Sequence, residues 1–366
     1  MRVSKLQVFE YDVAWVHGNY SMSHGRTAGT HRSLVVRVVT AEGLEGWAET
    51  CPNGRTYLPS FVEGERSALG VLGEAVIGLD PCELGPLNVA MDQVLMGSRA
   101  AKGAIDMACW DILGQATERS VAQLLGGVMQ ETVPLFVAIP IDSLNAMAGH
   151  VERDFATGVR VFQVKVGDEP TADVSRVRAV LEAAGPSSTV IADANGGWNL
   201  QSALLAARQL DGLPVQLEQP CRTMAECIEL RKHTGLPLIL DEVIVTMEDL
   251  MIAKLVAGVG GINLKPSRVG GFTRARAMRD AAEGLGMAFT VDDTWGGALT
   301  TAQNAALAAS CHPDNLTATT YFSDWVDPLV ATGPRTGTPG RGATPTEPGL
   351  GVVVNRDMLG PPVIDL

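Results

Sequence analysis

Hydrophobic and polar positions first alternate as they do in strands and then change to a helical repeat. Strand-like alternation occurs in residues 1–9, 34–39 and 46–49. The last two runs flank the polar segment 41–45, which predicts an antiparallel hairpin that the first strand joins. Apolar positions three and four residues apart then predict helices near residues 62–78, 85–97 and 100–117. Residues 1–127 are therefore expected to form a small α+β domain.

The pattern changes again after residue 127. Short apolar runs alternate with helical segments about eight times between residues 128 and 325. Parallel strands joined by helices make right-handed crossovers, so eight consecutive units most simply close into a TIM-type (β/α)8 barrel. Pro- and Gly-rich sequence at 334–351 interrupts the pattern, and the tail 326–366 is expected to return to the first domain. The prediction is an α/β barrel with an N-terminal capping domain.

Charged residues close the short apolar runs of the second half at nearly even intervals of about 23 to 28 residues. One strand, one helix and two loops require such a length, and the functional groups of a parallel barrel lie at the C-terminal ends of its strands. The residues concerned are Lys165, Asp193, Glu218, Asp241, Lys265 and the pair Asp292 and Asp293. They are predicted to meet in one active site.

Three of these residues predict a metal site. Asp193, Glu218 and Asp241 end consecutive predicted strands. A single carboxylate at a strand end is more often a helix cap or an ion-pair partner, but three in register favour joint ligation. Oxygen ligands without Cys or His suit Mg²⁺ better than zinc. One Mg²⁺ per subunit could stabilise the dianion that forms when a carboxylate substrate loses its alpha proton.

Two lysines flank this metal site. Lys165 ends the second predicted barrel strand and Lys265 ends the sixth, so a substrate between them would present both faces. Burial removes hydration from an ammonium group and can lower its pKa toward the working pH, which suits an acid or base. The alternative role for each lysine is a structural ion pair with the carboxylates. We expect both lysines to be catalytic.

Composition excludes several classes of function. The chain has 366 residues, 46% of them hydrophobic and 19% charged, and a net charge of −13 that argues against nucleic acid as a partner. The N-terminus has no apolar signal region and no stretch reaches membrane-spanning length. The six cysteines of the chain lack CxxC spacing, which favours a reducing compartment, and we expect a cytoplasmic protein. The cysteines are Cys51, Cys82, Cys109, Cys221, Cys227 and Cys311.

The strand-end residues resemble those of the enolase superfamily, in its branch like muconate-lactonizing enzyme. That branch carries Lys-x-Lys, Asp, Glu, Asp and Lys on strands two to six, and its known use of a lysine base with Mg²⁺ is implied by the resemblance. Further similar segments lie at residues 46–49, 124–127, 193–195, 218–220, 241–242 and 265–271. Gln163 departs from the pattern, because it replaces the first lysine of Lys-x-Lys and still points inward beside Lys165.

Other segments are similar to the proline betaine epimerases and cis-3-hydroxyproline dehydratases of this superfamily. They lie at residues 49–52, 56–60, 162–167 and 292–297. Such enzymes place carboxylates and aromatic rings around a cationic ring nitrogen. The resemblance implies the substrate-binding residues Gln163, Asn195, Tyr57, Asp292, Asp293, Trp295 and Tyr321. Ala298 and Thr320 stand where relatives often carry acids, which weakens the match to a cationic substrate.

Residues 15–26 break the strand alternation and resemble a loop that closes over the barrel mouth, with residues 53–57 as its partner. Gly18 and Gly25 could allow a hinge there. The sequence predicts an enzyme that acts on a small carboxylate, either dehydrating cis-3-hydroxy-L-proline or epimerising a proline betaine. Another carboxylate, muconate-like or a dipeptide, is an alternative, and a relative without turnover is a non-enzymatic one. A homo-oligomer, from dimer to octamer, is expected.

Overall fold

The sheet of the capping domain contains strands from both ends of the chain. The computed structural model describes residues 1–18 and 20–366, so Asn19 of the predicted lid lies outside the described residues. Strand β1 pairs on one edge with β4, which continues to β5, and on the other with β15 and β20 from the C-terminal tail. All pairs are antiparallel, and the bounds are β1 (Val3–Trp15), β4 (Thr30–Thr40), β5 (Glu45–Thr50), β15 (Val326–Asp327) and β20 (Ile364–Asp365).

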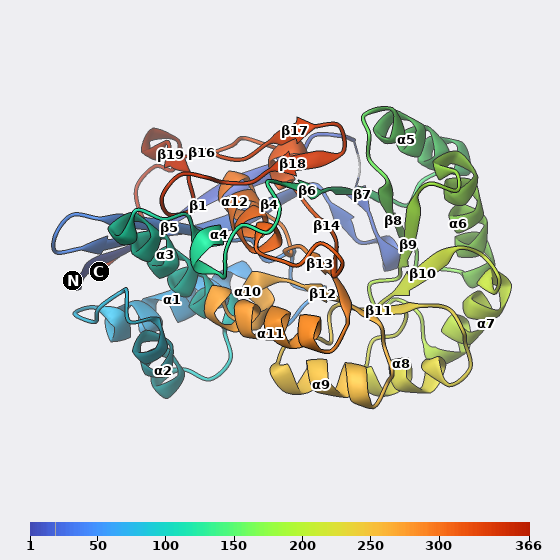
Figure 1. Ribbon diagram of the computed structural model, residues 1–366, viewed down its shortest axis with the longest axis horizontal. Coiled ribbons are helices and arrows are strands. Elements are labelled where there is room, and N and C mark those ends of the chain that lie inside the picture. Colours follow the sequence, from blue (N-terminus) through green and yellow to red (C-terminus); the bar gives the residue numbers. More distant parts are fainter. Residues whose placement is uncertain (19) are drawn as a thin grey trace.

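Helices cover the cap sheet and connect it to the barrel. They are α1 (Val62–Val76), α2 (Leu84–Val94), α3 (Arg99–Thr117) and α4 (Val121–Leu124). Figure 1 shows α1 to α3 at the end of the molecule where both chain termini lie. Helix α3 is buried on most of its surface because it lies between β5 and the barrel helix α10 (Pro266–Val269). The helices expected near residues 62–78, 85–97 and 100–117 therefore form within a few residues of those bounds.

Eight parallel strands within the described residues form the barrel, in strict chain order. They are β7 (Phe136–Ile139), β8 (Val161–Lys165), β9 (Thr189–Asp193), β10 (Val215–Glu218), β11 (Leu238–Leu240), β12 (Gly261–Leu264), β13 (Ala288–Val291) and β14 (Leu316–Thr319). A single parallel bridge, between Leu135 and Thr319, joins the two edges. The predicted (β/α)8 barrel with a cap is confirmed as a nearly closed barrel.

The barrel helices form an outer wall that Figure 1 shows as an arc from green to orange. They are α5 (Leu144–Ala156), α6 (Pro170–Ala184), α7 (Leu200–Leu210), α8 (Met224–Arg231), α9 (Met247–Leu255), α11 (Phe272–Gly284) and α12 (Ala298–Ala309). Helix α12 differs from the others, because every one of its residues is buried. A helix that is buried all round needs partners on every side, and α12 has the barrel on one side and β5 of the cap on the other.

Glu49 of β5 ties the cap to the start of α12. Its carboxylate accepts hydrogen bonds from the backbone amides of Gly297 and Thr300, each at 3.1 Å, and from the Tyr11 hydroxyl at 2.5 Å. A carboxylate at a helix N-terminus satisfies otherwise unpaired N–H groups and opposes the helix dipole. Gly297 must lack a side chain, because a Cβ there would collide with the Tyr11 hydroxyl. The cap therefore fixes the loop that follows β13.

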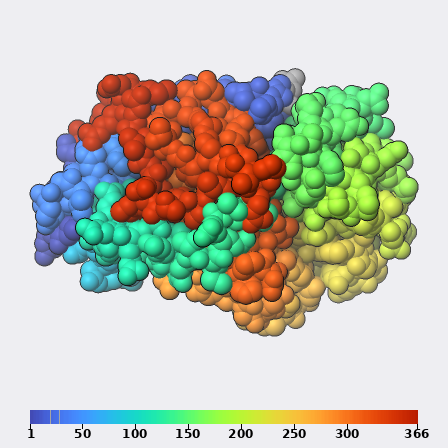
Figure 2. Space-filling view, turned by 45° about the horizontal axis from the view of Figure 1, so that its top comes forward, coloured from blue at the N-terminus to red at the C-terminus, as the bar shows by residue number. Residues whose placement is uncertain are grey.

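The C-terminal tail runs over both domains, as the red surface in Figure 2 shows. It contributes β16 (Ala331–Thr332) with β19 (Val353–Val354), and β17 (Thr336–Thr338) with β18 (Arg341–Ala343), which pairs with β6 (Thr132–Pro134). Short elements are β2 (Tyr20–Ser21), β3 (Thr27–Ala28) and the 3₁₀ turns Ser23–Gly25, Phe322–Asp324 and Arg356–Met358. In the described residues no helix has the length and apolarity needed to span a membrane. All six cysteines, which belong to that part of the chain, are free.

Candidate active site

Strand β8 directs two of the predicted residues into the barrel mouth. Lys165 is its last residue and Gln163 lies two positions earlier, so both side chains face the same side. Each is only 5% exposed. The Lys165 ammonium donates to Asp193 at 2.5 Å, and the Gln163 amide donates to Glu218 at 2.8 Å. Glutamine thus acts here as a neutral donor where a lysine would bring a second positive charge.

The three predicted metal ligands lie side by side. Asp193 and Glu218 are paired in register as the last residues of β9 and β10, and Asp241 directly follows β11. Each is 1% exposed. Asp193 also accepts from the backbone and side-chain amides of Asn195, at 2.8 and 2.9 Å, and Glu218 accepts from the Asn263 amide at 2.9 Å. Adjacent strand ends therefore bring the carboxylates together at one edge of the barrel.

Lys265 approaches the same carboxylates from the opposite side. It follows β12, and its ammonium lies 3.1 Å from Asp241 and 3.6 Å from Asp292. Arg268, one turn further on, also pairs with Asp241 and donates to the backbone oxygens of Ile244 and Asn263. The second and sixth strands of an eight-stranded barrel are diametrically opposed. A molecule in the mouth would therefore have one lysine on each face.

The pKa values of the two lysines differ from the expectation of a fall toward neutrality. Burial is the largest single effect and lowers the pKa of Lys165, but Asp193 and the other acidic neighbours together outweigh it, so the pKa lies above its ordinary value. The same holds for Lys265, where burial is outweighed by Asp241 and Asp292. Both lysines are therefore protonated as long as these carboxylates keep their full negative charge.

Negative charge exceeds positive charge at this end of the barrel. Six carboxyl groups gather around three cations, and the members are Asp193, Glu218, Asp241, Glu242, Asp292 and Asp293 with Lys165, Lys265 and Arg268. Burial and the charges of Asp193 and Asp241 raise the pKa of Glu218 well above its ordinary value. The buried Asp241 oxygen that faces the Lys265 ammonium at 3.1 Å accepts no well-aligned hydrogen bond from the described residues. A hard divalent cation fits this set of oxygen donors.

The carboxylates are nevertheless not arranged as a ready-made coordination sphere. Among the described residues, no three His, Cys, Asp or Glu side chains converge as a metal-binding group. Each carboxylate is instead held by a cation or an amide: Asp193 by Lys165, Glu218 by Gln163, and Asp241 by Arg268. Metal binding would require these carboxylates to exchange part of their contacts with cations for contacts with the ion.

A narrow cavity of about 30 Å³ lies between the lysines. Of the residues expected to bind substrate, those that line it are Tyr57, Gln163, Asn195, Asp292, Asp293 and Trp295. Asp292 accepts from the Thr320 hydroxyl at 2.5 Å, and Asp293 accepts from the backbone amide of Thr294 at 2.7 Å. Burial raises the pKa of Asp293 to about 6. Asp292 and Asp293 therefore differ in their hydrogen-bond partners, although they are adjacent in the chain.

Tyr321 lies away from this cavity. Its hydroxyl donates to the Ala343 carbonyl at 2.7 Å, and its ring packs beneath Gly342, where a Cβ would collide with it. It lines a different cavity, on the outer side of β7. The C-terminal tail therefore holds Tyr321 in place. The sequence around Tyr321 did not indicate that the tail would be its partner.

The sequence did not single out several residues that complete the cavity wall, namely Tyr20, Met22, Asn53, Phe136, Ala138, Thr294, Phe322 and Trp325. Tyr20 and Met22 belong to the predicted lid at 15–26, and Asn53 to its predicted partner. Their segment was identified, and only their individual positions were not. Within the lid, the imidazoles of His17 and His24 contact the backbone oxygens of Asp324 and Gly197, at 3.0 and 2.8 Å.

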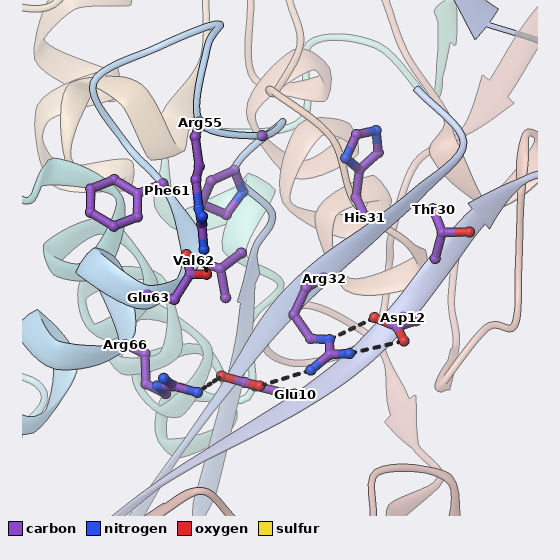
Figure 3. A pocket seen from close by; sticks show the side chains of 12 residues that line it. Glu10, Asp12, Thr30, His31, Arg32, Arg55, Phe61, Val62, Glu63 and Arg66 are labelled. Atoms are coloured by element: carbon purple, nitrogen blue, oxygen red, sulfur yellow. Dashed lines mark hydrogen bonds and ion pairs between the residues drawn. The ribbon is translucent and has the colours of Figure 1, made fainter. Parts of the chain in front are cut away.

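A much larger cleft of about 520 Å³ lies on the cap, over the ends of β1 and β4 and beside the first turn of α1. Figure 3 shows its charged side chains. Arg32 pairs with Asp12 at 2.6 Å and with Glu10 at 3.3 Å, Arg66 reaches Glu10 at 2.9 Å, and Arg55 pairs with Glu63. Each arginine in this cleft is thus paired with a carboxylate of the same cleft.

Comparisons with known proteins agree with this architecture. The Mandelate racemase / muconate lactonizing enzyme, N-terminal domain family matches residues 5–126, and the Enolase C-terminal domain-like family matches residues 146–358. A cis-3-hydroxy-L-proline dehydratase from Roseibium aggregatum is 39% identical over 99% of each chain. An N-succinyl-L-Arg/Lys racemase from Bacillus cereus is 31% identical over 70% of each chain.

Solved structures support the same assignment. A member of the enolase superfamily from Roseovarius nubinhibens ISM, crystallised in complex with magnesium, has a TM-score of 0.93 and 32% identity, covering 100% of this chain and 99% of that one. Relatives of this chain are thus dehydratases and racemases or epimerases. The chain belongs to the mandelate racemase and muconate lactonizing enzyme family of the enolase superfamily.

Proposed function

We propose that this enzyme removes the alpha proton of a small carboxylate with Lys165 or Lys265 and that its substrate is cis-3-hydroxy-L-proline, which it dehydrates. The observation that carries the proposal is the placement of the two buried lysines on opposite sides of one cavity. The support for the substrate is the 39% identity to a dehydratase of that amino acid along almost the whole chain.

The stereochemistry of the substrate fits two opposed lysines. In a cis-3-hydroxyproline the hydroxyl is on the same ring face as the carboxylate, so the alpha hydrogen is on the other face. Elimination of water breaks the C–H bond on one face and the C–O bond on the opposite face. A base is then required on one side of the ring and a proton donor on the other, and Lys165 and Lys265 would supply them.

Asp193, Glu218 and Asp241 would hold Mg²⁺ in this proposal. The bound ion would stabilise the negative charge that develops on the substrate carboxylate as the alpha proton leaves. Neutralising these carboxylates would also reduce the negative charge that raises the pKa values of both lysines, so burial would lower these values toward the working pH. Gln163 would keep Glu218 oriented through its hydrogen bond.

Two tasks remain, which are to bind the ring ammonium group of the substrate and to admit the substrate to the cavity. Asp292, held by Thr320, stands beside Lys265 and carries the negative charge that a ring ammonium group would face. A cavity of about 30 Å³ is smaller than a pyrrolidine ring, so the substrate enters when the roof formed by Tyr20 and Tyr57 moves aside. Closure then excludes water from the carbanionic intermediate.

Proton NMR in D₂O tests the proposal. The Mg²⁺-loaded enzyme is incubated with cis-3-hydroxy-L-proline, L-proline, proline betaine and 4-hydroxyproline betaine. Dehydration removes the alpha and C3 proton signals of the first compound and produces an enamine that tautomerises to a ring imine. Absence of both dehydration and alpha-proton exchange with all four compounds would refute a proline-type substrate.

Epimerisation of a proline betaine is the second candidate. The observation that favours it is the group of aromatic rings at the cavity, Tyr20, Trp295, Phe322 and Trp325, which could contact a quaternary ammonium group. The same pair of lysines would then remove a proton from one face and return one to the other. Appearance of the epimer without loss of a hydroxyl group would select this reaction.

A further inference from the structure

The indole N–H of Trp295 is a buried donor without an acceptor. Trp295 follows β13, lines the catalytic cavity and is 2% exposed. Its Nε1 has no hydrogen-bond partner among the described residues. An indole nitrogen can only donate, and a buried donor left unpaired loses the hydrogen bond that it makes to water in the unfolded chain. Native proteins leave few such groups, so this one calls for a partner outside the chain.

Packing prevents the indole from turning to find a protein acceptor. Its ring lies 5.2 Å from the ring of Tyr20, 5.8 Å from Phe322 and 6.0 Å from Trp15, measured between centroids. The His31 ring meets it edge-on at 5.2 Å. Tyr20 and Phe322 line the same cavity, so the indole is held in place by aromatic neighbours at the wall where a ligand would lie.

The chemistry of the candidate ligands decides which group could accept this hydrogen bond. We place their carboxylate between the two lysines that line the cavity, next to the carboxylates with which these lysines are paired. A quaternary nitrogen has neither a hydrogen nor a lone pair, and a ring ammonium group can only donate. A ring hydroxyl is the one remaining acceptor. Building on the proposed function, we infer that Trp295 donates from Nε1 to the substrate hydroxyl and so selects hydroxylated ring carboxylates.

Trp295→Phe tests this directly, because phenylalanine keeps an aromatic ring and removes the N–H. The variant is expected to lose roughly tenfold or more in kcat/KM for cis-3-hydroxy-L-proline. Alpha-proton exchange of L-proline, which has no hydroxyl, should fall by a smaller factor, because that compound loses only the packing contribution of the indole, so the ratio of the two rates drops. Trp325→Phe is the matched control in the same cavity, and it should change the rates for both compounds by similar factors.

A parallel loss for both compounds in Trp295→Phe would overturn the inference and leave the indole a packing or cation–π group. His31→Leu separates a second possibility, that the N–H serves the neighbouring imidazole. In that case His31→Leu would reproduce the selectivity change of Trp295→Phe, and the inference would be wrong. Wild-type enzyme inactive on every compound would instead refute the proposed function and this inference with it.

An NMR measurement gives a readout without turnover. Tryptophan-labelled Lys165→Met enzyme with Mg²⁺ is titrated with cis-3-hydroxy-L-proline and, separately, with L-proline. The indole N–H signal that is missing from the Trp295→Phe spectrum is expected to move downfield with the first compound and to stay in place with the second. An equal shift with both, or no shift with either, would contradict hydrogen bonding to the hydroxyl.

Discussion

The cavity between the two lysines and the cleft of Figure 3 differ in how their charges are arranged. In the cleft, Arg32 and Arg66 are paired with Glu10 and Asp12 and are 50% and 42% exposed, so water reaches the arginine of each pair. In the cavity the groups are buried and the carboxylates outnumber the cations. The difference indicates that the large cleft, whose charges are balanced and hydrated, is a surface feature. The small cavity, whose buried charges are unbalanced, has the electrostatic potential that the proposed catalysis needs.

Removal of one cation from each region should produce the largest contrast. Lys165→Met and Lys265→Met are each expected to lose about 10²–10⁴-fold in the rate of dehydration, because an acid or base is missing. Arg32→Met should leave the rate within about twofold, since its pairs are exposed and distant from the lysines. Initial rates with cis-3-hydroxy-L-proline check both, and an active Lys165→Met enzyme would contradict its role.

The next contrast is in stability without metal. Asp241→Asn leaves Arg268 and Lys265 without their shared carboxylate, and breaking a buried pair in this way costs about 3–5 kcal/mol. Asp12→Asn breaks an exposed pair and should cost less than about 1 kcal/mol. Urea unfolding in EDTA measures both, and equal costs would remove the distinction between the two regions.

Magnesium should stabilise the protein through the cavity alone. An ion that binds only the folded state adds about 2.7 kcal/mol at one hundred times its dissociation constant. The melting temperature is expected to rise with Mg²⁺, to fall back with EDTA, and to lose this response in Asp193→Asn. Glu10→Gln, in the cleft, should respond as wild type does. A response that survives in Asp193→Asn would place the ion elsewhere.

The smallest effect is expected from a buried carboxylate that pairs with no cation in the described part of the chain. Asp111 of α3 accepts from the backbone amides of Trp47 and Leu350, and burial raises its pKa to about 6. A raised pKa means that the folded state binds the proton more tightly, so this contribution to stability is lost as pH rises through about 6. Between pH 7 and 5, wild type should gain about 1 kcal/mol relative to Asp111→Asn. Urea unfolding of both proteins at the two pH values checks the sign.

The sequence predicted the parts of the site that depend on strand ends. Asp193, Glu218 and Lys165 are terminal residues of neighbouring parallel strands, so chain spacing alone brings them together. It did not predict the direction of the lysine pKa shifts, because that depends on distances of about 3 Å between side chains from different strands. The role of Arg268 as a second partner of Asp241 escaped for the same reason.

The cavity wall was predictable only where one segment supplies it. Trp295 lies in the motif after β13 and was identified, whereas Phe136 and Trp325 come from distant segments that meet only in the folded protein. Tyr321 shows the converse case. It lies two residues after the end of β14, which suggested a place in the site, but the hydrogen bond to Ala343 of the tail holds it outside.

The position of helix α12 between the two domains has a consequence for recombination between related genes. Because the helix has no exposed face and depends on Glu49 for its N-terminal hydrogen bonds, its packing belongs to both domains. A chimaera that joins the cap of one relative to the barrel of another would separate Glu49 from the helix it caps. We therefore expect β5 and the segment from Trp295 to α12 to recombine as one unit, although some 250 residues separate them in the chain.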